Sequence, residues 1–164
     1  MVISLTDHVV GIISWLIYFL LDNKSLSVYT ELTNKQSLSL AFKAKLHLTI
    51  STTINNSKKL NSIIARALDE ISEEIDLTNN LASIIIDDSL LSHSIVVGSK
   101  KYDNINKQIQ DESILKWGNR ASKYYFISEE KKTPKNIFHS VAVHHLLREK
   151  IKLNFNNFGL SIKY

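Results

Sequence analysis

The sequence predicts an α/β protein whose strands and helices follow the order βββαβ, then βαββ, then αβ. Three observations lead to this fold class. Apolar and alternating runs typical of strands fill the N-terminal third, a long amphipathic helix follows, and the rest of the chain mixes short strands with two further helices. A strand meander followed by a crossover helix and another strand predicts a mixed sheet.

The first element is an uninterrupted apolar run of thirteen residues, Val9 to Leu21. It is rich in β-branched and aromatic side chains, which favour a strand, and it is shorter than the roughly 20 residues of a membrane-spanning helix. No Lys or Arg precedes it, as a signal peptide would require. We therefore expect a long central strand covered on both faces, followed by a turn at 22–25. A membrane-inserted or interfacial segment at residues 1–21 is the alternative.

Two alternating segments follow, at 26–32 and 37–50. In the second segment the apolar residues occupy alternate positions, so we expect them on one face of a single strand. These residues are Leu38, Leu40, Phe42, Leu46, Leu48 and Ile50. The three strands together predict an antiparallel meander.

The amphipathic helix comes next, with Ser57 as its expected N-cap. Its apolar residues have the spacing of one helix face, and they are Leu60, Ile63, Ile64, Ala67, Leu68, Ile71 and Ile75. The C-terminal half carries carboxylates, which oppose the helix dipole at that end. They are Asp69, Glu70, Glu73, Glu74 and Asp76. We interpret this acidic end as a solvated face, with contact to a basic partner as the alternative.

The later elements are shorter. Two buried strands are expected at 81–87 and 90–98, and a helix from Asp103 to Trp117 that Gly118 ends. The last elements are a strand at 123–130, a turn at 131–135 with the only proline, a strand at 136–143, a helix at 144–158 ended by Gly159, and a strand from Leu160.

Composition limits the function classes. The chain has 164 residues, a net charge of +4 and no cysteine, which excludes disulfides and thiolate chemistry and is compatible with a reducing cytoplasm. Residues 1–99 hold 7 Lys and Arg against 10 Asp and Glu, whereas residues 100–164 hold 13 against 6. The basic part favours an acidic partner surface, anionic lipid or nucleic acid, and a merely soluble lysine-rich surface is the alternative.

The order of elements resembles the first half of actin-like proteins of the FtsA and PilM type. The closer similarity is to bacterial PilM-like pilus assembly proteins and to the cytoplasmic domains of secretion-system L proteins. It rests on Asp88-Ser89-Leu90 before a strand, the helix end LKWGNRASKYYF, and the segment VAVHHLLREKIKLNFNNFGLSI. The resemblance implies an actin-like, ribonuclease H-like core half at 1–88 and 144–164. It also implies an inserted βαββ subdomain at 89–143.

One departure from that family concerns nucleotides. The family's first strand normally ends in an Asp-containing, Gly/Ser-rich phosphate turn, whereas VVGIISWLIYFLL has no carboxylate. The glycines Gly11, Gly98, Gly118 and Gly159 form no clustered phosphate loop. The chain also stops where the second half of an actin-like fold would begin. We expect no cofactor and no nucleotide hydrolysis by this chain alone, and an actin-like ATPase fragment that needs a second half is the alternative.

Histidines and paired aspartates are the candidates for chemistry. His144 and His145 are expected about 100° apart on a helix, so they cannot share one metal. His93 and His139 approach each other if their strands are neighbours, but no acidic residue is spaced to complete a metal site. Asp87-Asp88 suits a strand-end turn better than a nuclease of ribonuclease H type, which also needs a carboxylate on the first strand. We expect neither catalytic nor metal-binding residues.

The favoured function is a non-catalytic cytoplasmic binding or scaffold module of a pilus-assembly or secretion-type inner-membrane platform. By resemblance, it receives the cytoplasmic tail of a membrane partner, or another assembly protein, and lies at the inner membrane through that partner. Homo- and hetero-oligomers both stay open. We expect the basic side of the binding surface at Lys100, Lys101, Lys107, Lys116, Arg120 and Lys123.

A basic nucleic-acid-binding domain is a further alternative. Its stacking residues would be Tyr102, Trp117, Tyr124, Tyr125 and Phe126. Most of these aromatic residues fall on faces that a small subdomain needs for its own core, so nucleic acid is the less favoured partner.

Overall fold

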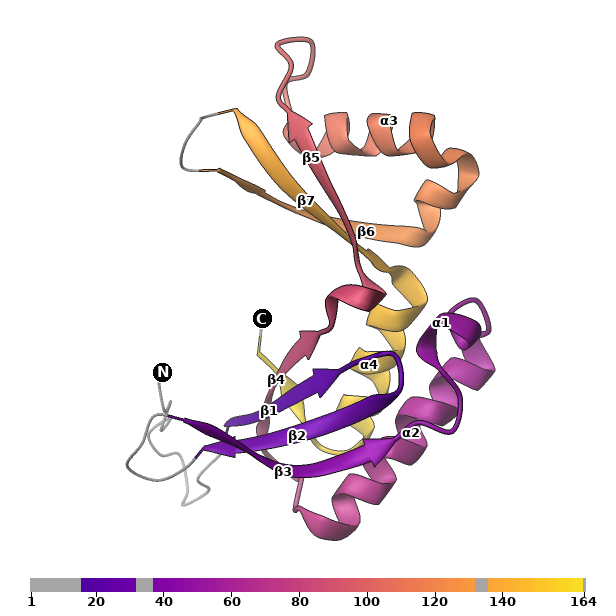
Figure 1. Cartoon of the computed structure of the whole chain (residues 1–164), viewed down its shortest axis with the longest axis vertical. Helices are drawn as coiled ribbons and strands as arrows, with labels where there is room; N and C mark the ends of the chain where they lie inside the picture. Colours follow the sequence, from indigo (N-terminus) through magenta and orange to yellow (C-terminus); the bar gives the residue numbers. More distant parts are fainter. Residues whose placement is uncertain (1–15, 32–36, 132–135, 164) are drawn as a thin grey trace. The chain divides into compact units, whose positions relative to one another are not determined.

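The computed structural model describes residues 16–31, 37–131 and 136–163. The chain divides into two compact units. The first unit holds the described residues up to Asp87 and from Glu149 onward, and the second unit is Asp88–Arg148. Figure 1 shows a separate sheet in each.

The first unit is built on a five-stranded mixed sheet with the strand order β3-β2-β1-β4-β8. Its strands are β1 (Leu16–Leu21), β2 (Ser25–Glu31), β3 (Leu38–Lys45), β4 (Leu81–Ile86) and β8 (Ser161–Ile162). β2 is antiparallel to both β1 and β3, whereas β4 is parallel to β1 and to β8. The predicted meander and the predicted mixed sheet are both confirmed.

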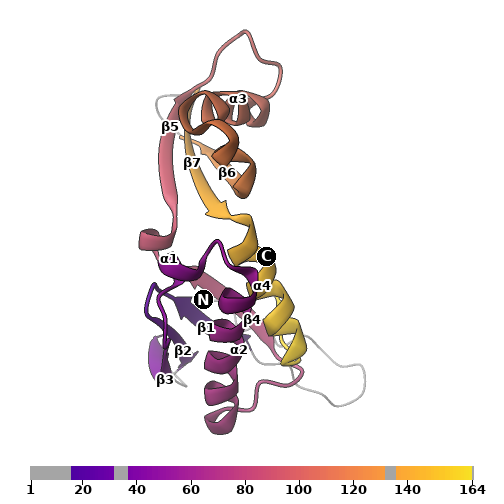
Figure 2. The ribbon, with the colours of Figure 1, turned by 90° about the vertical axis from the view of Figure 1, so that its right-hand side faces the viewer.

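One face of this sheet forms the core of the first unit. Ile17, Phe19 and Leu21 alternate along β1 and are buried. Two helices, α2 (Ser57–Glu74) and α4 (His145–Asn157), lie on the same side of β1 to β3 (Figure 2). The ring of Phe155 from α4 meets Phe19 edge-on, with 4.8 Å between centroids. The apolar stripe predicted for residues 60–71 is buried here, because it faces the sheet.

The opposite face of the same sheet is only partly covered. Leu16, Tyr18 and Leu20 alternate with the buried residues of β1 and are half-buried, and Ile85 of β4 is 53% exposed. The prediction that β1 is covered on both faces is therefore wrong in the part that the structure describes, and so is the prediction that 81–87 is a buried strand. Residues 9–15 of the predicted strand lie outside the described residues.

A β-bulge reverses the side of the sheet that the side chains in the first part of β3 face. Val28 pairs with Phe42 but Tyr29 pairs with Leu40, so Ala41 is the extra residue. Because alternate residues face opposite sides, the bulge places Leu38 and Leu40 on the side opposite Phe42. Both leucines are exposed, at 44% and 54%. The predicted single apolar face of 37–50 is therefore wrong.

The ends of two elements also differ from their prediction. β3 ends at Lys45, and the short helix α1 (Ile50–Thr53) replaces the end of the predicted strand. The N-cap of α2 is Asn56 rather than Ser57, because the Asn56 side chain accepts a 3.0 Å hydrogen bond from the Lys59 N–H.

The predicted turn at 22–25 is present and is organised by Asp22. The Asp22 carboxylate accepts hydrogen bonds from the backbone amides of Lys24 (2.6 Å) and Ser25 (2.8 Å) and from the Ser25 hydroxyl (2.6 Å). Burial alone would raise the pKa of Asp22, but these hydrogen bonds and the charge of Lys43 outweigh it and lower the pKa.

The second unit is a three-stranded antiparallel sheet with the order β5-β7-β6 and one long helix. Its elements are the 3-10 turn η1 (Asp88–Leu90), β5 (Ser92–Val97), α3 (Ile105–Trp117), the 3-10 segment η2 (Gly118–Lys123), β6 (Tyr124–Glu130) and β7 (Ile137–His144). The N-cap of α3 is Asn104, not Asp103, since its side chain accepts from the Asn106 N–H. Gly118 ends α3 with φ +59°, as predicted. Residues 132–135 of the predicted proline turn lie outside the described residues.

The sheet of the second unit has one helix-covered face and one open face. Val96, Ile109 of α3 and Ala142 are buried. On the other side Ile95, Val97 and Ile127 are 64%, 63% and 58% exposed. We call the side that carries Ile95, Val97, Tyr125 and Ile127 the open face. The prediction that 90–98 is a buried strand is therefore wrong, because no layer within 16–31, 37–131 or 136–163 covers its odd-numbered residues.

Candidate binding surface at strand β5

β5 is an edge strand, and the direction of its backbone groups follows from two hydrogen bonds. The Gly98 N–H donates to the Asn136 carbonyl (2.9 Å), which continues the ladder toward β7. The Val97 carbonyl instead accepts from the Gln108 side chain (2.8 Å). Because residues of an antiparallel strand alternate between facing the partner and facing away, the odd residues direct their backbone groups away from β7. We call the outward backbone of His93, Ile95 and Val97 the β5 edge.

The β5 edge lacks the usual protection against strand pairing. Natural edge strands carry Lys, Pro or a bulge that blocks a further strand. The sequence SHSIVV has neither Lys nor Pro, and its pairing with β7 is regular over all six residues. Ile95 and Val97 also present large apolar side chains beside this backbone. The strand is therefore suited to accept another extended segment.

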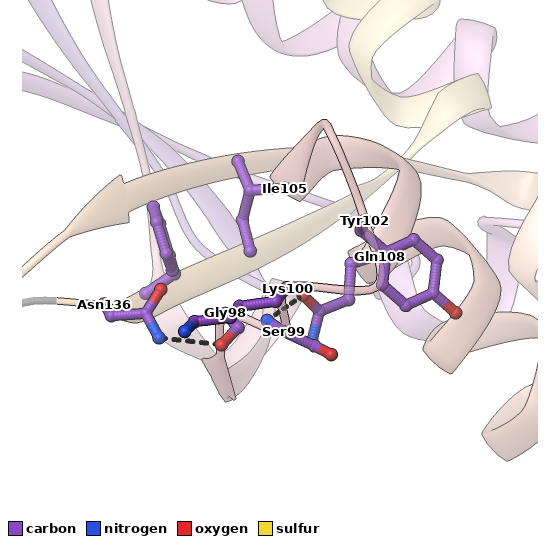
Figure 3. A pocket seen from close by; sticks show the side chains of 8 residues that line it. Gly98, Ser99, Lys100, Tyr102, Ile105, Gln108 and Asn136 are labelled. Atoms are coloured by element: carbon purple, nitrogen blue, oxygen red, sulfur yellow. Dashed lines mark hydrogen bonds between the residues drawn. The ribbon is translucent and has the colours of Figure 1, made fainter.

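A pocket of about 400 Å³ lies at the C-terminal end of β5 (Figure 3). The Asn136 side chain donates to the Gly98 carbonyl (2.7 Å), and the Ser99 N–H donates to the Gln108 side chain (2.8 Å). Gln108 is buried and also bonds the Val97 carbonyl, so it joins the helix to the strand end. Lys100 lines the same pocket and supplies a positive charge there.

A second pocket, of about 360 Å³, lies at the N-terminal end of β5. Ser92, the first residue of the strand, lines it together with Lys116, Trp117, Arg120 and Tyr124. Both ends of β5 are therefore next to basic side chains, and its middle is apolar.

The six predicted basic residues all lie in the second unit, and all are exposed. The structure brings Lys116 and Arg120 together at one pocket and places Lys100 at the other. Lys101 is next to Lys100, whereas Lys107 is on α3 and Lys123 ends η2, so the six form no single cluster. Residues 88–148 hold 10 Lys and Arg against 6 Asp and Glu, and the rest of the chain holds 10 against 10. The net positive charge thus belongs to the second unit.

The acidic end of α2 belongs to the first unit. Among its carboxylates, Glu70 lies 3.4 Å from Arg66 in an exposed ion pair, and Asp76 accepts hydrogen bonds from Thr78. The hydrogen bonds from the Thr78 hydroxyl and amide lower the pKa of Asp76.

His93 and His139 do approach each other on the open face. His93 Nδ1 and His139 Nε2 are 3.0 Å apart, and the two rings stack with centroids 5.2 Å apart. A carboxylate also lies close to this pair, because Asp88 Oδ1 is 3.4 Å from His93 Nε2. The five-residue separation across η1 gave no recognisable motif. Even so, no group of three or more potential ligands in the described part of the chain could hold a metal ion.

His144 and His145 occupy two different elements, so their predicted placement on one helix is wrong. His144 is the last residue of β7 and is buried, and His145 begins α4. The Leu146 N–H donates to His144 Nδ1 (3.2 Å), and Nε2 is buried without a hydrogen-bond partner among the described residues. Burial, with the nearby charges of Lys123 and His145, lowers the pKa of His144. The imidazole therefore caps the start of α4 in its neutral form.

The aromatic residues considered for nucleic-acid stacking largely pack against each other. The Trp117 ring lies 5.4 Å from Tyr124 and 5.9 Å from Phe126, between centroids. Tyr125 faces the other side, where the Arg148 guanidinium lies 4.2 Å from its ring centre. The contacts of Trp117, Tyr124 and Phe126 cover part of each of these three rings, and nucleic acid stays the less favoured prediction.

The fold of the chain matches solved structures, although its sequence matches no family model and no curated protein. The cytoplasmic domain of EpsL, an inner-membrane component of the type II secretion system of Vibrio cholerae, matches with a TM-score of 0.57 over 90% of this chain, at 10% identity. A chain of the PilM-PilN type IV pilus biogenesis complex matches with a TM-score of 0.57 over 91%, at 9% identity. The chain shares the fold of the EpsL cytoplasmic domain and of the matched chain of the PilM-PilN complex.

The match covers only part of those proteins. This chain spans 55% of the EpsL domain and 46% of the chain from the PilM-PilN complex. A Bacteroides thetaiotaomicron protein with an actin-like ATPase fold also matches, at a TM-score of 0.47 and 8% identity. The α/β class with a mixed sheet, predicted from the sequence, is confirmed by the observed strand order and pairing. No helix among the described residues has both the length and the hydrophobicity needed to cross a membrane.

Proposed function

We propose that the chain is a non-catalytic binding module of a pilus-assembly or secretion-type platform, and that it binds the cytoplasmic tail of a membrane protein. One observation carries the proposal. The two matches with a TM-score of 0.57 are an inner-membrane component of a secretion system and a pilus biogenesis complex, and each covers nine-tenths or more of this chain. In this proposal the chain works in the cytoplasm and reaches the inner membrane through its partner.

The surface chemistry of the second unit supports this function. An extended tail gains affinity from backbone hydrogen bonds and apolar contacts, and charge decides which tail is accepted. The second unit offers an apolar open face, an unprotected strand edge and the whole net positive charge of the protein. We assign Lys116 and Arg120, which share a pocket, as the basic residues that select an acidic tail, with Lys100 as a further contact. We also propose that this unit is an insertion into the core half.

A titration of membrane-protein tails tests the proposal. Neighbouring genes supply the candidates, and the cytoplasmic tail of each single-span membrane protein is synthesised with a fluorescent label and titrated with the full chain. We expect one tail to bind, and expect K116E/R120E to weaken it by roughly tenfold, as when two favourable charge contacts become repulsive.

The matched control is K58E/K59E, which reverses two exposed lysines of the first unit. This variant has the same change in net charge, so it should bind the tail within about twofold of the unchanged chain, apart from long-range screening effects. If no tail binds, the proposed function is contradicted. If both double variants lose the same affinity, the assignment of Lys116 and Arg120 is contradicted.

A further inference from the structure

We infer that the β5 edge is a strand-addition site that accepts an extended segment with alternating apolar residues and an acidic residue at each end. The inference deepens the proposed function, because it assigns the surface and the chemistry of the segment. It rests on the proposed function only for the source of that segment.

The backbone of β5 provides the first argument. The odd residues of β5 direct their amide and carbonyl groups away from β7. Of these groups, the Val97 carbonyl is already bonded to Gln108. The groups of His93 and Ile95 lie in the middle of the edge and match the spacing of an antiparallel or parallel neighbour. A segment that pairs here would extend the order to four strands.

The opposite edge of the same sheet provides a contrast within one unit. The Lys131 N–H donates to the Ile137 carbonyl, so the even residues of β6 direct their backbone groups outward. That edge ends in Glu129 and Glu130, and the Ser128 hydroxyl bonds Asn106 of α3. Charges and a helix contact therefore protect β6, whereas β5 has no Asp, Glu, Lys or Arg and its hydrogen bond with α3 is confined to the Val97 carbonyl.

The pockets and charges define the occupant. A six-residue strand is about 20 Å long, and each end of β5 has a pocket with a basic lining residue, Lys100 at one end and Lys116 with Arg120 at the other. Acidic residues that flank an extended segment would meet these charges. The apolar residues between them would lie beside Ile95 and Val97, which are 64% and 63% exposed.

A designed peptide tests the chemistry without knowledge of the natural partner. The probe alternates Thr with Val or Ile, has Asp at both ends and carries fluorescein. Two further peptides carry N-methyl groups on alternate amides, one on each side of the strand. We expect the full chain to bind the probe, and expect one N-methylated peptide to be weakened by roughly tenfold while the other is not. Equal binding of both methylated peptides would overturn strand addition.

Two matched protein variants locate the site. I95K places a charge on β5, and I127K places the same charge on β6 at a side chain of similar exposure, 58% against 64%. We expect I95K to weaken the probe by roughly tenfold and I127K by less than about twofold. Equal losses would show that the open face binds the probe without strand pairing, and would overturn the inference. Circular dichroism establishes that both variants are folded.

The remaining outcomes separate this inference from the proposed function. A membrane-protein tail that binds the chain and I95K equally would overturn the strand site and leave the proposed function intact. A probe that binds at β5 while no tail binds would leave the strand site and overturn the proposed function. If sedimentation shows a dimer that I95K dissociates, the occupant of the β5 edge is a second copy of the chain. The inference that a segment with acidic ends binds there would then be overturned.

Discussion

The two units each cover one face of a sheet with helix, but they differ in the number of strands and helices. In the first unit two helices lie on one face of a five-stranded sheet, and Phe19 and Phe155 are both fully buried between the layers. In the second unit one helix covers three strands, and the strand β5 has a single buried residue, Val96. The comparison indicates that the first unit serves as the stable core and the second unit presents a surface.

The largest effect should come from the core of the first unit. F19A removes a fully buried ring that contacts Phe155, so we expect the free energy of unfolding to fall by about 3–5 kcal/mol. Urea denaturation followed by circular dichroism measures this loss. As a control, Y125A removes a ring that is 39% exposed on the open face, and it should cost below about 1 kcal/mol. Similar costs would contradict the difference between the units.

A polar contact should matter most in the second unit. Q108L leaves the Ser99 N–H and the Val97 carbonyl without their side-chain partner, so we expect a loss of about 2 kcal/mol. Trp117 fluorescence follows this unit during denaturation when it is recorded in a W15F background, because the chain has two tryptophans, and amide exchange of the first unit serves as the control. If the exchange of both units increased equally, the two would unfold together and the comparison would be weakened.

A smaller effect is expected at the turn that leads into β8. Gly159 has φ +77°, and an added Cβ would lie 3.3 Å from Thr78 Cα. G159A should therefore destabilise the first unit by about 1–2 kcal/mol, from backbone strain and this close approach. A matched change, G118A, also has a positive φ but meets no atom within 4 Å, so it should cost less. Thermal unfolding ranks the two variants, and the reverse order would be inconsistent with the packing at Thr78.

The smallest effect concerns pH and the second unit alone. The pKa of His144 is lowered in the folded chain by burial and by the charges of Lys123 and His145. The unfolded chain therefore takes up a proton at a higher pH, near the ordinary value of 6.5, than the folded chain does. This contribution to stability is complete above pH 6.5 and decreases as the pH falls below it.

Replacement of His144 by Gln should flatten this pH dependence in the second unit and leave the first unit unchanged. Denaturation at a series of pH values, followed by Trp117 fluorescence in the W15F background, measures this pH dependence. An equally steep decrease in H144Q would assign the dependence to other groups.

The sequence predicted the elements because their patterns are local. The helix stripe from Leu60 to Ile71 and the glycines that end α3 and α4 needed no tertiary information. The β-bulge at Ala41 could not be predicted, because alternation shows how residues share a face only while the pairing stays regular. The exposure of Ile95 and Ile85 could not be predicted from the sequence either, because an apolar run does not reveal whether a second layer covers it.

The candidate site was predicted only in outline. The charge imbalance identified the basic part of the chain, and Lys116 and Arg120 do share a pocket. The β5 edge depends on strand order, and the contact of Asp88 with His93 depends on the local turn η1. Neither is encoded in residue spacing that sequence reasoning can recognise.

The most direct test of the binding account is amide hydrogen exchange of the full chain with and without its bound tail. The account predicts that the backbone amides of His93 and Ile95 become protected, because they donate to the added strand, while those of β6 and of the first unit keep their rates. Protection that excludes β5 and appears elsewhere would contradict the claim that this strand edge receives the partner.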